Sequence, residues 1–292
     1  MKYKMESKKI IITGANSGIG KAAAIQLANL GATVIMACRS EERGRTAVEE
    51  VRQVTGNNNI EFMQVDLSLQ KSIRQFANEY LSKHDRLDVI IHNAANFDHS
   101  LKKVTKTPEG FETVFATNHL GVFLLTNLFL EALLKSTPSR IITIASKGLM
   151  MYPFLDIDFN NLNGERRFTL QHAYYQSKLA QVMFTYELAR RLEGTGVTVN
   201  CVRVANVAIP DERLTHLPSW QRKVYSLKRK MAITPEKQAE TYVFLAADPS
   251  VEGISGKYWD ENNKPVRSNA NSYNYLTQKK LWEISASMTG LT

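Results

Sequence analysis

The chain of 292 residues has only two cysteines and no long uninterrupted apolar run. Cys38 and Cys201 lie far apart in strand-like segments without a CxxC pair, so we expect buried free thiols in a reducing compartment. The six histidines show no ligand spacing, and we predict no metal site. No segment approaches the about 18 to 20 continuous apolar residues that span a bilayer, and the amino-terminal residues carry no apolar signal region. A cytoplasmic protein is therefore expected.

Charge of one sign is also not concentrated anywhere, although the formal net charge is +9. Basic residues are scattered, with modest clusters at 222–230 and 279–280, a distribution typical of solvated helix faces. A nucleic-acid-binding protein usually shows a basic stripe with interleaved aromatic residues, so this class is excluded. General attraction of a polyanionic small ligand is the more useful interpretation.

What the sequence does contain is a regular alternation of short apolar runs and amphipathic stretches, with no linker or repeat that divides it. Most apolar runs are continuous, as in strands buried on both faces. The alternation predicts an α/β protein with a Rossmann-type, doubly wound parallel sheet of about seven strands and helices on both faces. We expect one domain over 1–292, with a core at about 8–260 and a carboxyl-terminal extension at 261–292. Strands are expected at residues 9–13, 33–38, 60–66, 87–92, 140–145, 197–202 and 256–260. Helices are expected at residues 18–30, 41–55, 70–83, 111–134, 173–193 and 235–247.

A glycine-rich loop, TGANSGIG at 13–20, follows the first expected strand and leads directly into a helix. Glycines at this place permit a tight turn and close backbone approach, and the helix amino terminus offers free N–H groups to a pyrophosphate. The strand–loop–helix context makes this a strong signal for dinucleotide binding. The loop residues expected at the cofactor are Gly14, Asn16, Ser17, Gly18, Ile19 and Gly20.

The second strand ends in ACRS, with Arg39 where an NAD-selective protein would carry an acid. An arginine fork suits a 2′-phosphate, so the position favours NADP(H) over NAD(H), although a plain surface arginine is the alternative. After the third strand, Asp66 and Leu67 are placed to meet the adenine, or Asp66 simply N-caps the next helix. Asn93 and Ala94, after the fourth strand, are small enough to let the backbone approach the cofactor.

The motifs TGANSGIG, HNAA, TNHLG, ITIAS and YYQSK occur in the order found in the short-chain dehydrogenase/reductase family, which the chain resembles over about residues 8–260. ACRS, NHLGVFLLTNLF and the insertion after IAS are similar to the retinol dehydrogenase and WW-domain oxidoreductase branch. The resemblance implies a catalytic set of four residues. These are Asn118, Ser146, Tyr174 and Lys178.

The implied roles make chemical sense. Free tyrosine, with a pKa near ~10, is a weak base at neutral pH, and a neighbouring ammonium favours its phenolate. Tyr174 would donate a proton to a carbonyl oxygen or take one from an alcohol. Ser146 would hydrogen-bond that oxygen, Lys178 would also hold the nicotinamide ribose, and Asn118 would hold a water that links Lys178 to solvent. Ser146 alone is equally compatible with a cap, and Asn118 alone with a polar residue inside a helix.

Two adjacent tyrosines compete for the role of proton donor. Both Tyr174 and Tyr175 are helical neighbours of Lys178. Tyr175 continues into an apolar stripe that should pack, whereas Tyr174 continues into the polar pair Lys178 and Gln181. Tyr174 is therefore the expected donor.

Three features depart from the family pattern. The first is Ala95, which replaces the glycine of NAG. The second is the loop after the sixth strand, where Val204-Ala205 stand at the usual Pro-Gly positions and Ile209 replaces a threonine expected at the nicotinamide. The third is an insertion. An apolar insertion at 150–172 separates Ser146 from Tyr174 and is either a surface loop or a wall of the substrate pocket.

The resemblance implies an NADP(H)-dependent oxidoreductase that transfers a hydride between nicotinamide and a carbonyl or alcohol of a small or lipophilic substrate. The alternatives are a weakly active or inactive NADP(H)-binding regulatory protein and a carbon–carbon double-bond reductase like protochlorophyllide reductase. The family commonly associates through the helices at about 111–134 and 173–193, which implies a homodimer or homotetramer. We expect residues 269–292 to form a polar segment and a short helix that closes over the cleft or packs at an interface.

Overall fold

The structure is a computed structural model, and it describes residues 4–98, 100–207 and 232–291. One eight-stranded sheet runs through the molecule in the order β3-β2-β1-β4-β5-β6-β7-β8. The first seven strands in this order are parallel and only β8 pairs antiparallel, with β7. The predicted fold class is confirmed, and β8 adds one short strand to the seven expected. The strands are β1 (Lys9–Thr13), β2 (Thr33–Cys38), β3 (Ile60–Gln64), β4 (Val89–His92), β5 (Ser139–Ser146), β6 (Val197–Val204), β7 (Lys257–Trp259) and β8 (Pro265–Val266).

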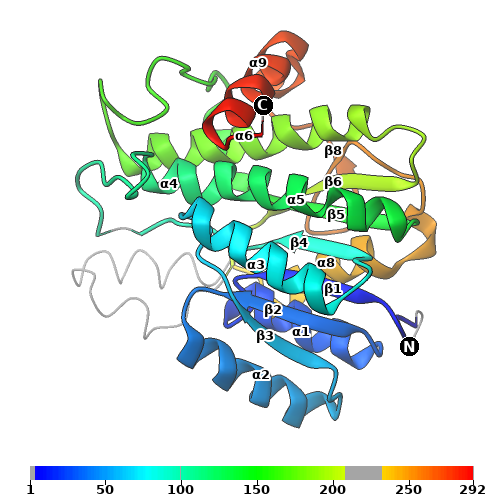
Figure 1. The fold of residues 1–292 in the computed structure, drawn as a ribbon. Helices are drawn as coiled ribbons and strands as arrows, with labels where there is room; N and C mark the ends of the chain where they lie inside the picture. Colours follow the sequence, from blue (N-terminus) through cyan, green and yellow to red (C-terminus); the bar gives the residue numbers. More distant parts are fainter. Residues whose placement is uncertain (1–3, 99, 208–231, 292) are drawn as a thin grey trace.

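The helices cover both faces of this sheet (Figure 1). They are α1 (Gly18–Asn29), α2 (Glu41–Thr55), α3 (Gln70–Lys83), α4 (Thr113–Phe115), α5 (Gly121–Lys135), α6 (Leu170–Arg191), α8 (Pro235–Ala247) and α9 (Tyr275–Met288). Shorter turns are the π-helical η1 (Ala116–Leu120) and the 3-10 segments η2 (Lys147–Met151), η4 (Pro249–Val251) and η5 (Ala270–Tyr273).

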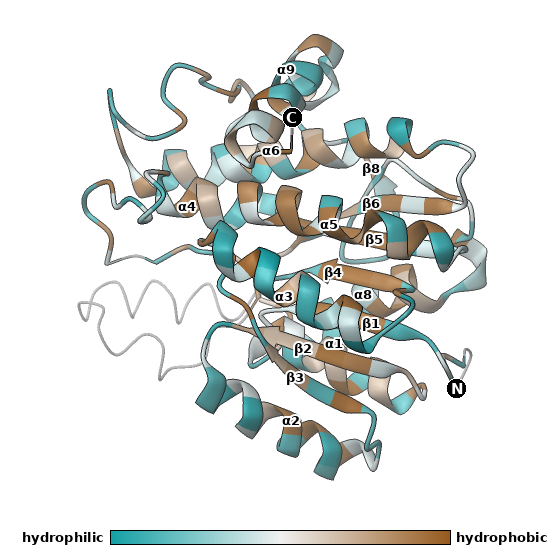
Figure 2. Cartoon of the chain, in the orientation of Figure 1, coloured by the Kyte–Doolittle hydropathy of each residue, from teal (hydrophilic) through white to brown (hydrophobic). Residues whose placement is uncertain are grey.

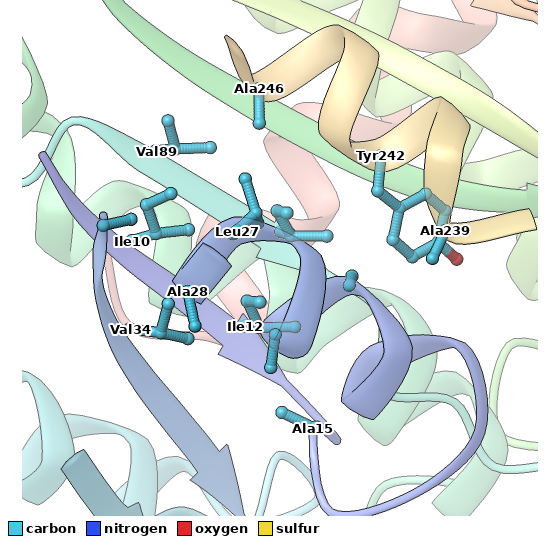
Figure 3. Close-up of a cluster of buried hydrophobic side chains, with 14 of the residues drawn as sticks. Ile10, Ile12, Ala15, Leu27, Ala28, Val34, Val89, Ala239, Tyr242 and Ala246 are labelled. Atoms are coloured by element: carbon cyan, nitrogen blue, oxygen red, sulfur yellow. The ribbon is translucent and has the colours of Figure 1, made fainter. Parts of the chain in front are cut away.

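The three isoleucines of β1 show how one strand serves two cores. Ile10 and Ile12 point to the face covered by α1 and α8, where they pack among Leu27, Val34 and Tyr242 (Figure 3). Ile11 points to the opposite face, covered by α3, α5 and α6. All three isoleucines are fully buried, which explains why the strand is apolar without alternation. Figure 2 shows the same pattern across the sheet, with hydrophobic strands inside and hydrophilic outer surfaces on helices such as α2.

The strand order reverses between β1 and β4. In open parallel sheets this switch point opens a crevice at the carboxyl ends of the strands. The loops after β1, β2, β4 and β5 all end at this edge, so the topology gathers the predicted cofactor and catalytic residues there.

The helix expected over 111–134 is not continuous. It is divided into α4, the π-helical turn η1 and α5, and the helix expected from Ala173 begins earlier, at Leu170, after the N-cap Thr169. By length and composition Thr113–Lys135 is apolar enough to cross a membrane, but 72% of its most apolar window is buried inside the fold. It is a core helix of this structure.

The carboxyl-terminal helix expected from the sequence is α9, which lies beside α6 (Figure 1). Trp282 stacks on Phe184 of α6 at 5.9 Å between ring centroids and meets Phe123 of α5 edge-on at 4.8 Å. Arg74 of α3 donates to the carbonyl of Thr289. The carboxyl-terminal segment therefore contacts α3, α5 and α6.

Candidate active site

The glycine loop lies directly after β1, and its shape depends on glycine at two points. Gly14 has a φ of 65°, and a Cβ there would lie 3.0 Å from Ala94 Cα. A Cβ on Gly20 would lie 2.4 Å from Asn93 Nδ2 and 2.7 Å from the Gly14 carbonyl oxygen. Helix α1 begins at Gly18 with Ser17 at its N-cap, and Ile19 packs against the core below. The backbone of residues 14–20 and the amino terminus of α1 form what we call the cofactor cradle, where helix N–H groups suit a pyrophosphate.

Asn93 braces this cradle from the neighbouring strand. Its Nδ2 donates to the carbonyl oxygens of Thr13 and Gly14, at 3.0 and 3.2 Å, and its Oδ1 accepts from the Tyr242 hydroxyl. The Ala94 N–H donates to Thr13 Oγ1. The loop after β4 is thus bonded to the glycine loop, so Asn93 contributes more than the small size for which it was predicted.

Two arginines lie at the end of β2. Arg39 is exposed, and it enters none of the ion pairs found within residues 4–98, 100–207 and 232–291. Arg43, in the first turn of α2, lies against the Asn16 amide, and with the amide oxygen turned towards the guanidinium this oxygen accepts from Nε and Nη2 at 3.1 and 2.9 Å. Sequence reasoning missed Arg43, although its place three residues after the cap Ser40 was a usable signal. The Arg43 guanidinium places positive charge beside Asn16 of the glycine loop.

Asp66 does not cap helix α3, because the N-cap of α3 is Leu69. Its Oδ1 accepts instead from the N–H and hydroxyl of Ser68, at 2.9 and 2.6 Å. Leu67 is buried, and a Cβ on Gly121 of α5 would lie only 2.2 Å from the Leu67 carbonyl oxygen. The capping alternative is therefore wrong, and an adenine contact by Asp66 stays a prediction.

The structure brings Ser146, Tyr174 and Lys178 together beside this cradle. Ser146, the last residue of β5, faces the Tyr174 hydroxyl. The ammonium of Lys178 lies 5.6 Å from the centroid of the Tyr174 ring and donates to the Ile144 carbonyl at 2.8 Å. Burial lowers the pKa of Lys178 to about 8. Burial also raises the pKa of Tyr174, against the smaller effect of Ser146, so the protein itself keeps Tyr174 as a phenol that can donate its proton.

Asn118 lies in the π-helical turn and joins two sides of the site. Its Oδ1 accepts from Asn96 N–H at 2.6 Å, and its Nδ2 donates to the Asn96 carbonyl and to Ser177 Oγ, both at 3.0 Å. Ser177 in turn donates to the Tyr174 carbonyl. The Asn118 carbonyl accepts from the Gln181 amide. These bonds give Asn118 a positioning role, while the water expected between it and Lys178 stays a prediction.

The two tyrosines have different surroundings. Tyr175 packs against Tyr152 of the insertion, at 4.4 Å between ring centroids, and a Cβ on Gly148 would lie 2.5 Å from its hydroxyl. Tyr174 stacks on Phe97 at 4.0 Å and turns its hydroxyl to Ser146. The geometry agrees with the choice of Tyr174 over Tyr175. Phe97 is a site residue that the sequence did not single out.

Comparison with known proteins decides the family. A family model for short chain dehydrogenase matches residues 8–156. Retinol dehydrogenase 14 of Homo sapiens is 40% identical over 301 residues, covering 98% of this chain and 88% of that protein. Retinol dehydrogenase 11 of Mus musculus is 38% identical over 287 residues, covering 98% and 88%. The chain belongs to the short-chain dehydrogenase/reductase family, in its retinol dehydrogenase branch.

Solved structures share the fold of this short-chain dehydrogenase/reductase. A protein from Mycobacterium paratuberculosis matches with a TM-score of 0.72 and 27% identity, over 99% of this chain and 96% of its own. A Shigella flexneri short chain dehydrogenase complexed with NADP matches with a TM-score of 0.69 and 24% identity, over 90% of this chain and all of its own.

The departures of this short-chain dehydrogenase/reductase from the family pattern have local explanations. Ala95 is exposed and does not have a left-handed backbone, so its methyl group is accommodated. Strand β6 continues through Val204, and the Ala205 N–H donates to Gln238 of α8 at 2.9 Å. The path of the chain up to Ala205 therefore needs neither proline nor glycine. Ile209 lies outside the described residues.

The insertion at 150–172 is partly core and partly surface. Ile157 and Leu162 are buried with the underside of α6, whereas Met151 and Phe154 are 79% and 93% exposed. Asn269, in the segment before α9, donates to the Tyr152 carbonyl at 2.8 Å. The insertion is thus folded against the protein, and its exposed apolar tip follows directly after Ser146.

Proposed function

We propose that this protein is an NADP(H)-dependent oxidoreductase that interconverts a carbonyl and an alcohol on a lipophilic substrate, with Tyr174 as general acid and base. The observation that carries the proposal is the grouping of Ser146, Tyr174 and Lys178 at one place, with the Lys178 ammonium 5.6 Å from the centroid of the Tyr174 ring. This arrangement lies at the sheet edge beside the glycine loop, which would hold a pyrophosphate.

Each part of the cofactor has residues of this chain that would hold it. The backbone of 14–20 and the start of α1 would hold the pyrophosphate. Arg39 and Arg43 would hold the 2′-phosphate, for which guanidinium forks are suited. Lys178 would hold the nicotinamide ribose. When bound, the nicotinamide supplies the hydride in reduction and accepts it in oxidation.

The protein's own contribution to reduction is proton delivery and charge stabilisation. As the substrate carbon gains a hydride, its oxygen gains negative charge, and Ser146 and Tyr174 are placed to hydrogen-bond it. Tyr174 then transfers its phenolic proton to that oxygen, giving the alcohol and a phenolate. The ammonium of Lys178 stabilises this phenolate across the short separation between the two side chains.

The lipophilic substrate class is supported by the relatives, which are named retinol dehydrogenases. It is also supported by the site, where the Phe97 ring lies against the Tyr174 ring. An apolar wall of this kind favours a carbonyl joined to a hydrocarbon over a hydrated polar substrate. The cytoplasmic location expected from the sequence stays a prediction.

The test is NADPH and NADH oxidation with retinal and with short aldehydes, ketones and enones. Tyr174→Phe should lower kcat by at least about 100-fold, as expected when a general acid is removed. Tyr175→Phe, the matched control, should stay close to the parent. Product identity separates the alternatives, because a double-bond reductase gives the saturated carbonyl and a carbonyl reductase gives the unsaturated alcohol. Cofactor binding without turnover of any carbonyl would leave the regulatory alternative.

A further inference from the structure

The residue after Asn118 connects the catalytic segment to the carboxyl-terminal helix. His119 Nε2 lies 2.7 Å from Ser285 Oγ of α9, 166 residues further along the chain. Both side chains are buried, with exposed fractions of 1% and 0%. A contact of this kind, between a turn at the active site and the last helix, is not required for the fold of either element alone.

The surroundings fix the direction of this hydrogen bond. Ser285 Oγ donates its proton to the Leu281 carbonyl at 2.7 Å, so it accepts from an Nε2–H of His119. Burial lowers the pKa of His119 to about 3, and the ring is therefore neutral at ordinary pH. The ring of Phe115 lies 5.0 Å from the imidazole and that of Phe184 lies 6.3 Å away. The aromatic contacts and the bond to Ser285 together hold the imidazole between α9 and α6.

The π-helical turn transmits this orientation to the site. A π turn carries one residue more than an α turn and often occurs at functional sites. Asn118, in the same turn, holds the backbone of Asn96 beside Phe97 and, through Ser177, the carbonyl of Tyr174. A shift of the turn would therefore reach both rings that form the floor of the site.

Other contacts should keep helix α9 docked when the Ser285 hydroxyl is removed. Trp282 packs on Phe184 and Phe123, and the Met288 carbonyl accepts from Gln70 at 2.7 Å. Removing one hydroxyl should loosen the turn while leaving the helix in place. A variant that lacks only the Ser285 hydroxyl therefore tests the bond between Ser285 and His119 while α9 remains in place.

We propose that Ser285 and His119 are positioning residues through which α9 holds the catalytic turn and so aligns Tyr174. Neither residue touches substrate or cofactor in this scheme. The kinetic part of the proposal rests on the proposed function. The structural part, the coupling of α9 to the turn, does not.

The test compares Ser285→Ala with Thr289→Val. Thr289, the C-cap of α9, is equally buried, and its substitution also removes one hydroxyl, which is bonded to the carbonyls of Ser285 and Ala286 rather than to His119. Small misplacements of catalytic groups are known to lower rates by up to about 100-fold, and we expect Ser285→Ala to lower kcat by about 10-fold with an unchanged KM for NADPH. Thr289→Val should stay within about 2-fold of the parent. His119→Phe and the double variant should lose no more than Ser285→Ala, because one bond is removed in all three.

Amide hydrogen exchange gives a readout that does not depend on activity. Ser285→Ala should exchange faster than Thr289→Val within 93–97 and 113–120 and equally within α1. Equal exchange of the two variants in those segments would overturn the proposal, and so would equal kcat values. A parent protein inactive on every carbonyl would instead refute the proposed function, while hydrogen exchange would still decide the coupling.

Discussion

The buried ammonium of Lys178 makes a quantitative prediction about stability and pH. Lys178 is 2% exposed, and its ammonium donates to one backbone carbonyl. Burial lowers its pKa from 10.5 to about 8. The folded protein therefore releases this proton at lower pH than the unfolded chain does. Between about pH 8 and 10.5 the unfolded chain binds more protons, so this group makes the free energy of unfolding rise with pH.

The magnitude follows from the two pKa values. Below about pH 8 both states are protonated, and the penalty for burying the charge is present in full. At about 1.4 kcal/mol for each tenfold change in proton affinity, the whole penalty is about 3 kcal/mol. Relief of this penalty should amount to about 1 kcal/mol at pH 9 and to roughly 2 to 3 kcal/mol at pH 10.

The assay is urea unfolding of the parent and of Lys178→Met, followed by tryptophan fluorescence at several values between pH 7 and 10. Other groups titrate in this range, but both proteins share them, so the difference between the two unfolding free energies isolates Lys178. As pH rises, the free energy of unfolding of the parent should increase relative to that of Lys178→Met. A difference that stays constant within about 0.5 kcal/mol from pH 7 to 10 would refute a desolvated ammonium at this position.

Three further predictions concern the cofactor cradle and the covered helix face. Gly20→Ala places a methyl group on Asn93 Nδ2 and the Gly14 carbonyl, so NADPH affinity should fall at least about 10-fold in a fluorescence titration; Gly194→Ala strains a left-handed backbone but meets no neighbouring atom, and it controls for general destabilisation. Arg39→Asp should raise the NADH/NADPH ratio of kcat/KM by about 100-fold, because a carboxylate repels the 2′-phosphate; an unchanged ratio would remove Arg39 from that site. Trp282→Ala uncovers the apolar face of α5 and α6. Light scattering should therefore show a larger average mass for the variant than for the parent at the same concentration.

The sheet could be predicted because its signals are local. Strands such as β1 are buried on both faces, so apolar residues run without interruption, and the loops that follow them are marked by glycine or small polar residues. The catalytic set was inferred from the family resemblance, whose motifs, such as ITIAS and YYQSK, are each short and local. These features depend on residues close together in sequence.

The π-helical turn could not be predicted, because its cause is tertiary. Residues 111–134 have continuous helical periodicity, but Gly121 packs directly on the Leu67 carbonyl and Asn118 bonds to Asn96. These contacts make the extra residue of the turn favourable, and no local pattern reports them. Asp66 is a local case: Ser68, two residues further on, donates to its carboxylate, and Leu69 is the N-cap of α3.

The position of α9 connects two properties that the sequence treats separately. Trp282 covers the apolar face of α5 and α6, the face through which relatives were expected to associate. One turn further along, Ser285 bonds to His119 beside Asn118. A subunit partner bound to that face would have to displace Trp282, and with it the helix that holds the catalytic turn. The same helix therefore covers this face and aligns the site, so selection that acts on one of these properties also acts on the other.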